Sequence, residues 1–304
     1  MGKLNQFSSC FLCGSTATVV TDYLRFNSDD LKRNLAYSLP KLIANFLCSF
    51  SPRFATAYYP VAVNKKYFNR YAVYCRNCLT GSCQPSFEKE ELANYYQKFY
   101  WNNRDSNDGQ HLALADRPNN LQLALTHDRI VWIDQSLTHV ESVIDFGAGD
   151  CAAAFTYSKR AGIRSVHVVD PSARTGALAT KYGVGYSEDL VQAPISDLIY
   201  SAHSIEHVHD LLETIRALLT KLRVGGHVFF ETPNIGGQEI FEELCHTPHT
   251  FMLSASTFQL LEKYFPVKII RIECCGPVWQ KSGKQIKAAE KADLRVLLKK
   301  ISDV

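Results

Sequence analysis

The pattern of apolar and polar positions between residues 141 and 171 predicts a strand, a tight turn, a helix and a second strand. Val143–Ile144 is a short apolar run, as expected of a strand that is buried on both faces. Gly147 and Gly149 follow it, and because they lack a Cβ they let the backbone of a turn approach a ligand closely. Helix formers come next, and a second apolar run ends at Asp170. An acidic residue about 20 positions beyond a glycine turn is typical of sites that bind a nucleotide ribose.

The same alternation of apolar runs and helix-forming stretches continues beyond Asp170 and predicts a doubly wound α/β fold. Further strands are expected at residues 183–186, 197–201, 227–231 and 267–272, and helices at residues 173–182, 210–222 and 255–264. After residue 276 only Val278 and Trp279 are apolar before a basic run, so no clear seventh strand is predicted. Residues 284–301 have the pattern of a helix with a solvated lysine face.

The part of the chain before residue 141 is richer in helical and aromatic patterns. Helices are expected at residues 29–50, 87–100 and 118–138. The aromatic stretch at residues 54–74 is expected to form packed strands, with a carbohydrate-facing surface as the less favoured alternative.

Composition limits the classes of function. The chain has 304 residues and a formal net charge of +3, which is too small to indicate a nucleic-acid partner. No apolar run approaches the roughly 20 residues of a membrane span, and the N-terminus lacks the apolar core of a signal peptide. Several of the 10 cysteines lie in apolar surroundings, which favours reduced thiols over a disulfide framework. We therefore expect a cytoplasmic protein, and the sequence does not indicate its oligomeric state.

Two C-x-x-C pairs indicate a metal site. Cys10 and Cys13 form the first pair, and Cys75 and Cys78 form the second. Each pair places two thiolates on one tight turn, and two such turns complete a tetrahedral site that suits Zn²⁺. Cys83 is a possible substitute ligand. Because four thiolates leave no open coordination position, this zinc would be structural.

The glycine turn distinguishes between possible ligands of the α/β domain. A dinucleotide site needs the pattern G-x-G-x-x-G, because a pyrophosphate must lie on the helix N-terminus. Here Gly147 and Gly149 are followed by Cys151 and Ala152, and Asp145 precedes the turn. This combination suits a ligand with a cationic amine and no pyrophosphate. The stretch resembles the first two motifs of the class I S-adenosylmethionine (SAM) methyltransferases, with Cys151 in place of the third glycine.

Later segments extend this resemblance over nearly the whole chain. Residues 202–208 (AHSIEHV) and residues 231–234 (ETPN) are similar to the ends of the fourth and fifth strands of these enzymes. With the C-x-x-C pairs, they resemble the bacterial methyltransferases that carry an N-terminal zinc-binding segment, including the C-methyltransferases of deoxysugar biosynthesis. The implied fold class is α/β, a Rossmann-like class I methyltransferase sheet with a small zinc-knuckle segment. Its expected parts are a zinc-binding segment at 1–100, a linking helix at 101–140, a SAM-binding domain at 141–280 and a C-terminal helix at 281–304.

The resemblance also implies which residues contact SAM. The methionine end would be held at the glycine turn, the ribose hydroxyls and the adenine by acidic residues, and the sulfonium at the end of the fourth strand. These positions are Asp145, Gly147, Gly149, Asp170, Pro171, Asp189, Ala202 and His203.

Two histidines before the helix at residues 255–264 are candidates for catalysis. In the sugar C-methyltransferases that this segment resembles, a histidine here is placed to act as a general base. An imidazole titrates near neutral pH and can accept a proton from a hydroxyl or an acidic carbon. His249 is the first candidate and His246 the second, whereas His207 is expected to be structural. Some O-methyltransferases bind a divalent metal through an E-x-x-E-H motif, but His203 replaces the first glutamate here, so no catalytic metal is expected.

The acceptor is less well defined by the sequence. The resemblance favours a nucleotide-linked sugar or a glycan precursor, followed by the hydroxyl of a small aromatic or secondary metabolite. RNA comes third, because residues 202–204 are not the N/D-P-P-Y/F motif of the methylases of exocyclic base amines. A catalytically degenerate SAM-binding subunit is the non-enzymatic alternative.

Overall fold

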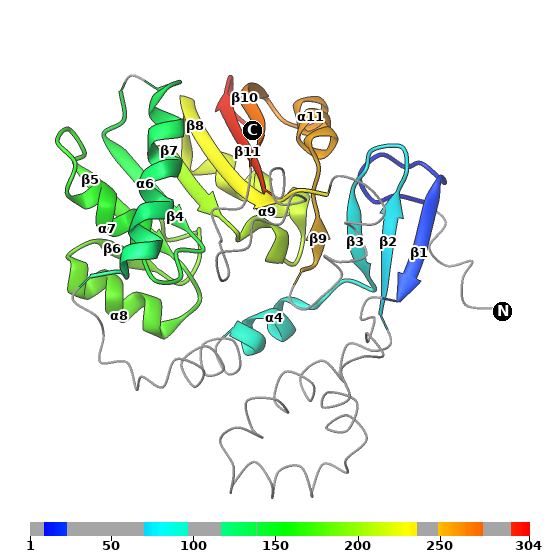
Figure 1. The fold of residues 1–304 in the computed structure, drawn as a ribbon, viewed down its shortest axis with the longest axis horizontal. Coiled ribbons are helices and arrows are strands. Elements are labelled where there is room, and N and C mark those ends of the chain that lie inside the picture. Colours follow the sequence, from blue (N-terminus) through cyan, green and yellow to red (C-terminus); the bar gives the residue numbers. More distant parts are fainter. Residues whose placement is uncertain (1–8, 23–69, 97–116, 138, 236–248, 276–292) are drawn as a thin grey trace, which may run out of the picture.

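The structure is a computed structural model that describes residues 9–22, 70–96, 117–137, 139–235, 249–275 and 293–304. Its centre is a seven-stranded sheet with the order β10-β11-β8-β7-β4-β5-β6 (Figure 1). Among the strands of these ranges, β11 runs antiparallel to both of its neighbours, β8 and β10, and the other pairings in this sheet are parallel. The strands are β4 (Ser142–Phe146), β5 (Ser165–Val169), β6 (Gly185–Ser187), β7 (Ser196–Ala202), β8 (Leu222–Pro233), β10 (Val267–Cys275) and β11 (Asp293–Lys300).

Helices cover both faces of this sheet, because alternate side chains of its strands point to opposite layers. Ile144 packs in one apolar cluster with residues of α9 (Leu211–Thr220) and α11 (Ala255–Tyr264). Its neighbour Val143 packs in a second cluster with residues of α6 (Asn120–Asp134), α7 (Ala152–Ser158) and α8 (Ala173–Tyr182). The α/β fold class that the sequence predicts is confirmed.

The strand order reverses between β4 and β7. From β4 the chain continues to β5 and β6 on one side, and it then returns to β7 and β8 on the other. In open α/β sheets, ligands bind outside the carboxyl ends of the strands at such a reversal. This rule places the candidate site after Phe146 and Ala202, the last residues of β4 and β7.

The prediction of a C-terminal helix is wrong for residues 293–300. They form β11, which lies between β8 and β10 and supplies the seventh strand that the sequence did not reveal. Val296 and Leu298 face one apolar cluster, while Leu297 faces the other. A strand buried on both faces has no clear polar alternation, so its run of leucines followed by lysines looks like part of a helix. Residues 276–292 lie outside the described part of the chain.

A second, smaller sheet joins the two halves of the sequence. Its order is β1-β2-β3-β9, with β1 (Thr18–Asp22), β2 (Tyr71–Cys75) and β3 (Gly81–Gln84) from the N-terminal segment. The fourth strand, β9 (Phe251–Met252), follows the large sheet's β8 in the sequence and pairs with Gly81 and Ser82 of β3. The N-terminal segment is therefore hydrogen-bonded to the stretch that carries His249.

Two of the helices predicted before residue 141 are present in the described part of the chain. The helix predicted at 87–100 is α4 (Lys89–Tyr95), and the one predicted at 118–138 is α6. The helix predicted at 29–50 lies outside the described residues, as does most of the aromatic stretch at 54–74. The domain boundaries remain predictions. None of the helices in the described ranges combines the length and the apolar character needed to span a bilayer.

Candidate functional site

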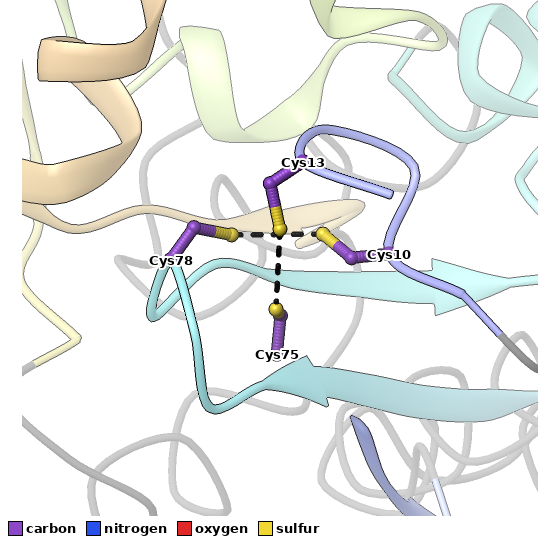
Figure 2. A group of neighbouring side chains, drawn as sticks. All are labelled: Cys10, Cys13, Cys75 and Cys78. Atoms are coloured by element: carbon purple, nitrogen blue, oxygen red, sulfur yellow. Dashed lines mark hydrogen bonds between the residues drawn. The ribbon is translucent and has the colours of Figure 1, made fainter. Parts of the chain in front are cut away.

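The two C-x-x-C pairs meet in one cluster, as Figure 2 shows. The thiols of Cys10 and Cys78 lie 3.6 Å apart, as do those of Cys13 and Cys75, and all of these sulfur atoms lie within 4.8 Å of one another. A tetrahedral zinc with Zn–S bonds of about 2.3 Å holds its sulfur ligands about 3.8 Å apart. The donor set and its spacing therefore fit a closed zinc site. Cys83 is buried but is not part of this cluster.

These four thiols, which we call the thiol cluster, pack directly against helices of the large sheet. Leu212 of α9 and Leu260 of α11 contact it. The hydroxyl of Ser254, the N-cap of α11, donates to the carbonyl of Cys78 at 3.2 Å. The hydroxyls of Thr80 and Thr257 are 2.7 Å apart. The thiol cluster thus anchors the start of α11 as well as the small sheet.

The glycine turn after β4 lies against the end of β7. Gly147 has a φ of +69°, and a Cβ on it would lie 2.3 Å from the hydroxyl oxygen of Ser204. That hydroxyl donates to the Gly147 carbonyl at 3.1 Å. Gly149 also has a positive φ, +56°. Both glycines are therefore favoured by backbone conformation, and Gly147 is also required by close contact.

Replacing Gly147 by alanine should destabilise the fold and disturb the turn. The left-handed backbone costs about 1–2 kcal/mol and the overlap with Ser204 about 1–3 kcal/mol more. Gly162→Ala is the matched control, because Gly162 has a φ of +88° with nothing within 4 Å of its Cβ position. Urea unfolding should therefore show a larger loss for Gly147→Ala than for Gly162→Ala. Equal losses would contradict the close contact.

Cys151 explains the departure from the usual glycine pattern. It adopts φ 60° and ψ 27°, the left-handed conformation that favours glycine. Its side chain is fully buried, and its thiol lies 3.6 Å from the Thr175 carbonyl. The turn therefore keeps the backbone shape of a glycine-rich loop while a buried side chain fills the space behind it.

Two buried carboxylates hold the turn. Asp170, directly after β5, accepts hydrogen bonds from the backbone of Gly149 at 3.0 Å and of Ser172 at 2.8 Å. Asp145, in β4, accepts one from Ala154 at the start of α7 at 2.9 Å. Burial raises the pKa of both groups, to about 7 for Asp145. Asp145 thus lies inside the fold, beneath the turn, while Asp170 links the turn to the end of β5.

The other predicted cofactor residues lie around these ends. Asp189 is exposed, and its carboxylate caps the backbone of Val191 at 2.9 Å. Pro171 is exposed beside Asp170, and Ala202 is half-buried at the end of β7. His246 lies outside the described residues.

His203 begins the loop after β7 in an unusual conformation. Its φ is +53°, and its backbone donates to the Glu231 carbonyl at 2.7 Å. Its imidazole lies between two buried carboxylates, 3.6 Å from that of Glu206 and 3.2 Å from that of Glu231. Burial alone would lower the pKa of His203, but these carboxylates raise it to about 10. His203 is therefore a cation held between β7 and β8.

Glu231 is the centre of a buried ionic network. Arg129 of α6 and Arg295 of β11 each donate to its carboxylate at 2.6 Å. Burial would raise the pKa of Glu231, but His203 and Arg129 hold it well below its usual value of 4.5. The network fixes β8, β11 and α6 to one another beneath His203.

Replacing Glu231 by glutamine should destabilise the protein by about 3–5 kcal/mol, because it removes the counter-charge of buried Arg129 and one of the two carboxylates paired with Arg295. A carboxylate with a lowered pKa stabilises the fold above its unfolded pKa, and this stability is lost as the pH falls. The wild-type free energy of unfolding should therefore fall below about pH 4.5, and Glu231→Gln should remove part of that fall. Urea unfolding at several pH values measures both effects, and an unchanged stability would contradict the network.

A cluster of Glu206, His207 and His249 lies beside His203, and we call it the His–Glu cluster. Residues 203–207 (HSIEH) match the H-x-x-E-H motif of some zinc proteases, which needs both histidines on one face of a helix. Here Glu206 and His207 belong to a 3-10 turn, η4 (Ile205–His207), so the segment does not have that arrangement. His249 comes from the segment before β9, and its ring centroid is 4.8 Å from that of His207. Burial would raise the pKa of Glu206, but His207 and His203 lower it to about 2.

Hydrogen bonds from the residue after His249 fix this arrangement. The backbone of Thr250 donates to the Glu206 carbonyl at 2.9 Å, and its hydroxyl donates to the carbonyls of Glu206 and Val208. The Thr250 carbonyl in turn accepts from Cys83 of β3 at 2.8 Å. Tyr96 contacts His207 edge-on, with ring centroids 6.2 Å apart. His249 is therefore held between the small sheet and the end of β7.

Sequence reasoning missed several residues of this region. It assigned no role to Glu206, Glu231, Arg129 or Arg295, although Glu206 and Glu231 stand in the segments that carry the resemblance. Each of these charged residues has apolar neighbours in the sequence. That pattern could have indicated buried ion pairs, because charged side chains in otherwise buried elements are rarely left unpaired.

Comparison with known proteins agrees with this architecture. A family model described as a methyltransferase domain matches residues 90–261, which is more than half of the chain. The chain therefore belongs to this family of methyltransferases. No curated protein matches the sequence.

Solved structures of methyltransferases align with this chain at low sequence identity. The magnesium protoporphyrin IX methyltransferase ChlM from Synechocystis PCC 6803, solved with bound SAH, aligns with a TM-score of 0.50 and 13% identity, over 70% of this chain and 100% of that chain. An S-adenosylmethionine dependent methyltransferase from Mesorhizobium loti aligns with a TM-score of 0.43 and 18% identity, over 56% of this chain and 96% of that chain.

Proposed function

We propose that this methyltransferase binds SAM at the glycine turn and transfers the methyl group to a small acceptor at the His–Glu cluster. One observation carries the proposal. Ser204 contacts Gly147 through its hydroxyl and is also the N-cap of the turn η4 that holds Glu206 and His207. The turn that would bind the cofactor and the groups that would bind the acceptor are thus joined by one residue.

The residues of this chain fit SAM. The open side of a glycine turn with left-handed backbone suits the methionine end, and Asp170 has the position after β5 from which a carboxylate accepts from both ribose hydroxyls. Asp189, on the loop after β6, would lie near the adenine. A cationic amine at the turn would favour the charged form of buried Asp145, whose pKa burial raises to about 7.

His249 is proposed as the general base. In the transfer, the acceptor atom bonds to the methyl carbon as the C–S bond breaks, and the bonding electron pair stays on sulfur. The imidazole of His249 would take the proton that the acceptor atom loses. Glu206, within the same cluster, would stabilise the imidazolium that results. Alignment of the acceptor with the methyl group would supply most of the acceleration.

A nucleotide-linked sugar or a glycan precursor is the proposed acceptor class, with a small aromatic or secondary-metabolite hydroxyl as the alternative. We further propose that the thiol cluster binds one structural Zn²⁺. The resemblance to the zinc-containing sugar methyltransferases supports both points.

Methyl-labelled SAM incubated with the protein and a cell extract tests the function. Label in the fraction of small anionic metabolites would support the proposed acceptor and identify a compound for further work. Label in RNA or protein would overturn the acceptor class but keep the chemistry. Absence of label from every fraction, with SAM binding intact, would favour the degenerate subunit.

A further inference from the structure

We propose that Glu206, His207 and His249 form a binding site for one divalent cation, separate from the thiol cluster, and that this cation holds the oxygen of the acceptor. The inference rests on the proposed function for SAM binding and for the position of the acceptor. It replaces the general-base role proposed there for His249 with that of a metal ligand. Its ligands include Glu206 and His207 of the metal motif considered in the sequence, but His249, from a distant segment, takes the place of the missing first glutamate as the third ligand.

The geometry of the cluster suits a shared ion. One ligand atom from each of the three residues lies within 4.8 Å of the others, and Glu206 and His207 approach to 3.7 Å. Ligand atoms that share a cation at about 2.1 Å lie roughly 3–3.5 Å apart for bond angles of 90–110°. Small side-chain rotations would therefore bring the three groups onto one ion.

The carboxylate of Glu206 is the independent sign of a missing partner. Its side chain is 2% exposed. Within the described part of the chain, neither of its oxygens receives a hydrogen bond. The imidazoles at 3.6 and 3.7 Å are close enough for charge attraction but too far for hydrogen bonds. The imidazoles offset the charge of Glu206 but leave both of its oxygens without a direct contact, and a bound cation would supply one.

The ligands are held in place by the backbone. Glu206 and His207 are adjacent in η4, and the hydrogen bonds from Thr250 to the Glu206 carbonyl fix His249 beside them. His203 is not needed as a ligand, because its Nε2 lies 3.2 Å from the carboxylate of Glu231 and pairs with it. The site therefore needs little rearrangement to accept an ion.

The donor set indicates the type of cation. Two imidazoles and one carboxylate suit Mn²⁺, Fe²⁺, Co²⁺ or Zn²⁺ better than Mg²⁺, which prefers oxygen ligands. Three protein ligands leave positions open for the acceptor. A hydroxyl bound there would lose its proton more readily, and that proton would pass to solvent. His249 would then act as a ligand of the cation and not as the base itself.

Titration with Co²⁺ tests the site on the full-length protein with its zinc content measured beforehand. Calorimetry should detect one further cobalt site per chain. The absorption spectrum of the same sample should lack the thiolate charge-transfer band that cobalt in the thiol cluster would give. Glu206→Gln, which keeps the shape of the side chain, should weaken this binding about 100-fold or more. His227→Asn is the matched control, since His227 lies in β8 outside the cluster, and it should bind cobalt as the wild type does.

The outcomes separate this inference from the proposed function. Equal cobalt affinity in the wild type and Glu206→Gln, or no thiolate-free binding at all, would overturn the cation site. SAM affinity measured on the same samples tests the proposed function by itself. Loss of cobalt binding in Glu206→Gln, with SAM affinity unchanged, would support the site and exclude unfolding as the cause.

Discussion

Replacing His249 by alanine is expected to lower methyl transfer about 100- to 10,000-fold, the usual contribution of general acid–base catalysis. The same loss is expected if His249 is a ligand of an activating cation. SAM affinity should stay within about threefold of the wild type, because His249 lies in the His–Glu cluster and not at the glycine turn. The measurement is the initial rate with the acceptor fraction that the labelling experiment identifies.

The control for this variant is His227→Ala. His227 is a half-buried histidine of β8 that pairs with Lys299 of β11, and it should keep wild-type turnover. Full activity of His249→Ala would refute a catalytic part for this histidine. A parallel fall in SAM affinity would instead point to a structural part.

The double replacement Cys75→Ser and Cys78→Ser is expected to remove zinc and abolish turnover. Zinc binding to a structural site of this kind is worth about 10–16 kcal/mol at pH 7, and it is coupled to folding. The cluster anchors β2 and β3, and β3 pairs with β9 directly after His249 and Thr250. Loss of zinc should therefore displace His249. The glycine turn is not part of the thiol cluster or the small sheet, so the variant should keep part of its SAM affinity.

Metal analysis and urea unfolding check this expectation. Freshly purified wild type should contain about one zinc per chain, and the double variant none. Cys83→Ser is the control, because Cys83 is buried in β3 of the same sheet but outside the cluster, and it should retain the zinc. A wild type without zinc, or a double variant with normal turnover, would contradict the structural role.

The central unit of the fold could be predicted because its signals are local. The apolar run of β4, the glycines at 147 and 149 and the acidic Asp170 lie within one short stretch, and each reports its own backbone environment. The C-x-x-C pairs were equally clear, because two thiolates on a tight turn have few other uses in a reduced protein.

The parts of the fold and of the site that the sequence did not predict depend on contacts between distant segments. Strand β11 looks helical because it is buried on both faces, and strand β9 consists only of Phe251 and Met252. Glu206 and His249 are distant in the sequence, and His249 directly precedes the segment whose strand β9 pairs with β3 of the small sheet. The periodicity of a single stretch does not predict such long-range contacts. The His–Glu cluster and the Glu231 network could therefore be identified only from the structure.

The most direct test of the central claim is a calorimetric titration of SAM into the wild type and Asp170→Ala. We expect one SAM per wild-type chain and at least about a 100-fold loss of affinity in the variant, because hydrogen bonds to a charged group are worth about 1.5–3 kcal/mol each. Asp134→Ala, which removes an exposed carboxylate paired with Arg160, should bind SAM normally. Unchanged SAM affinity in Asp170→Ala, or no binding to the wild type, would contradict the assignment of the glycine turn as the cofactor site.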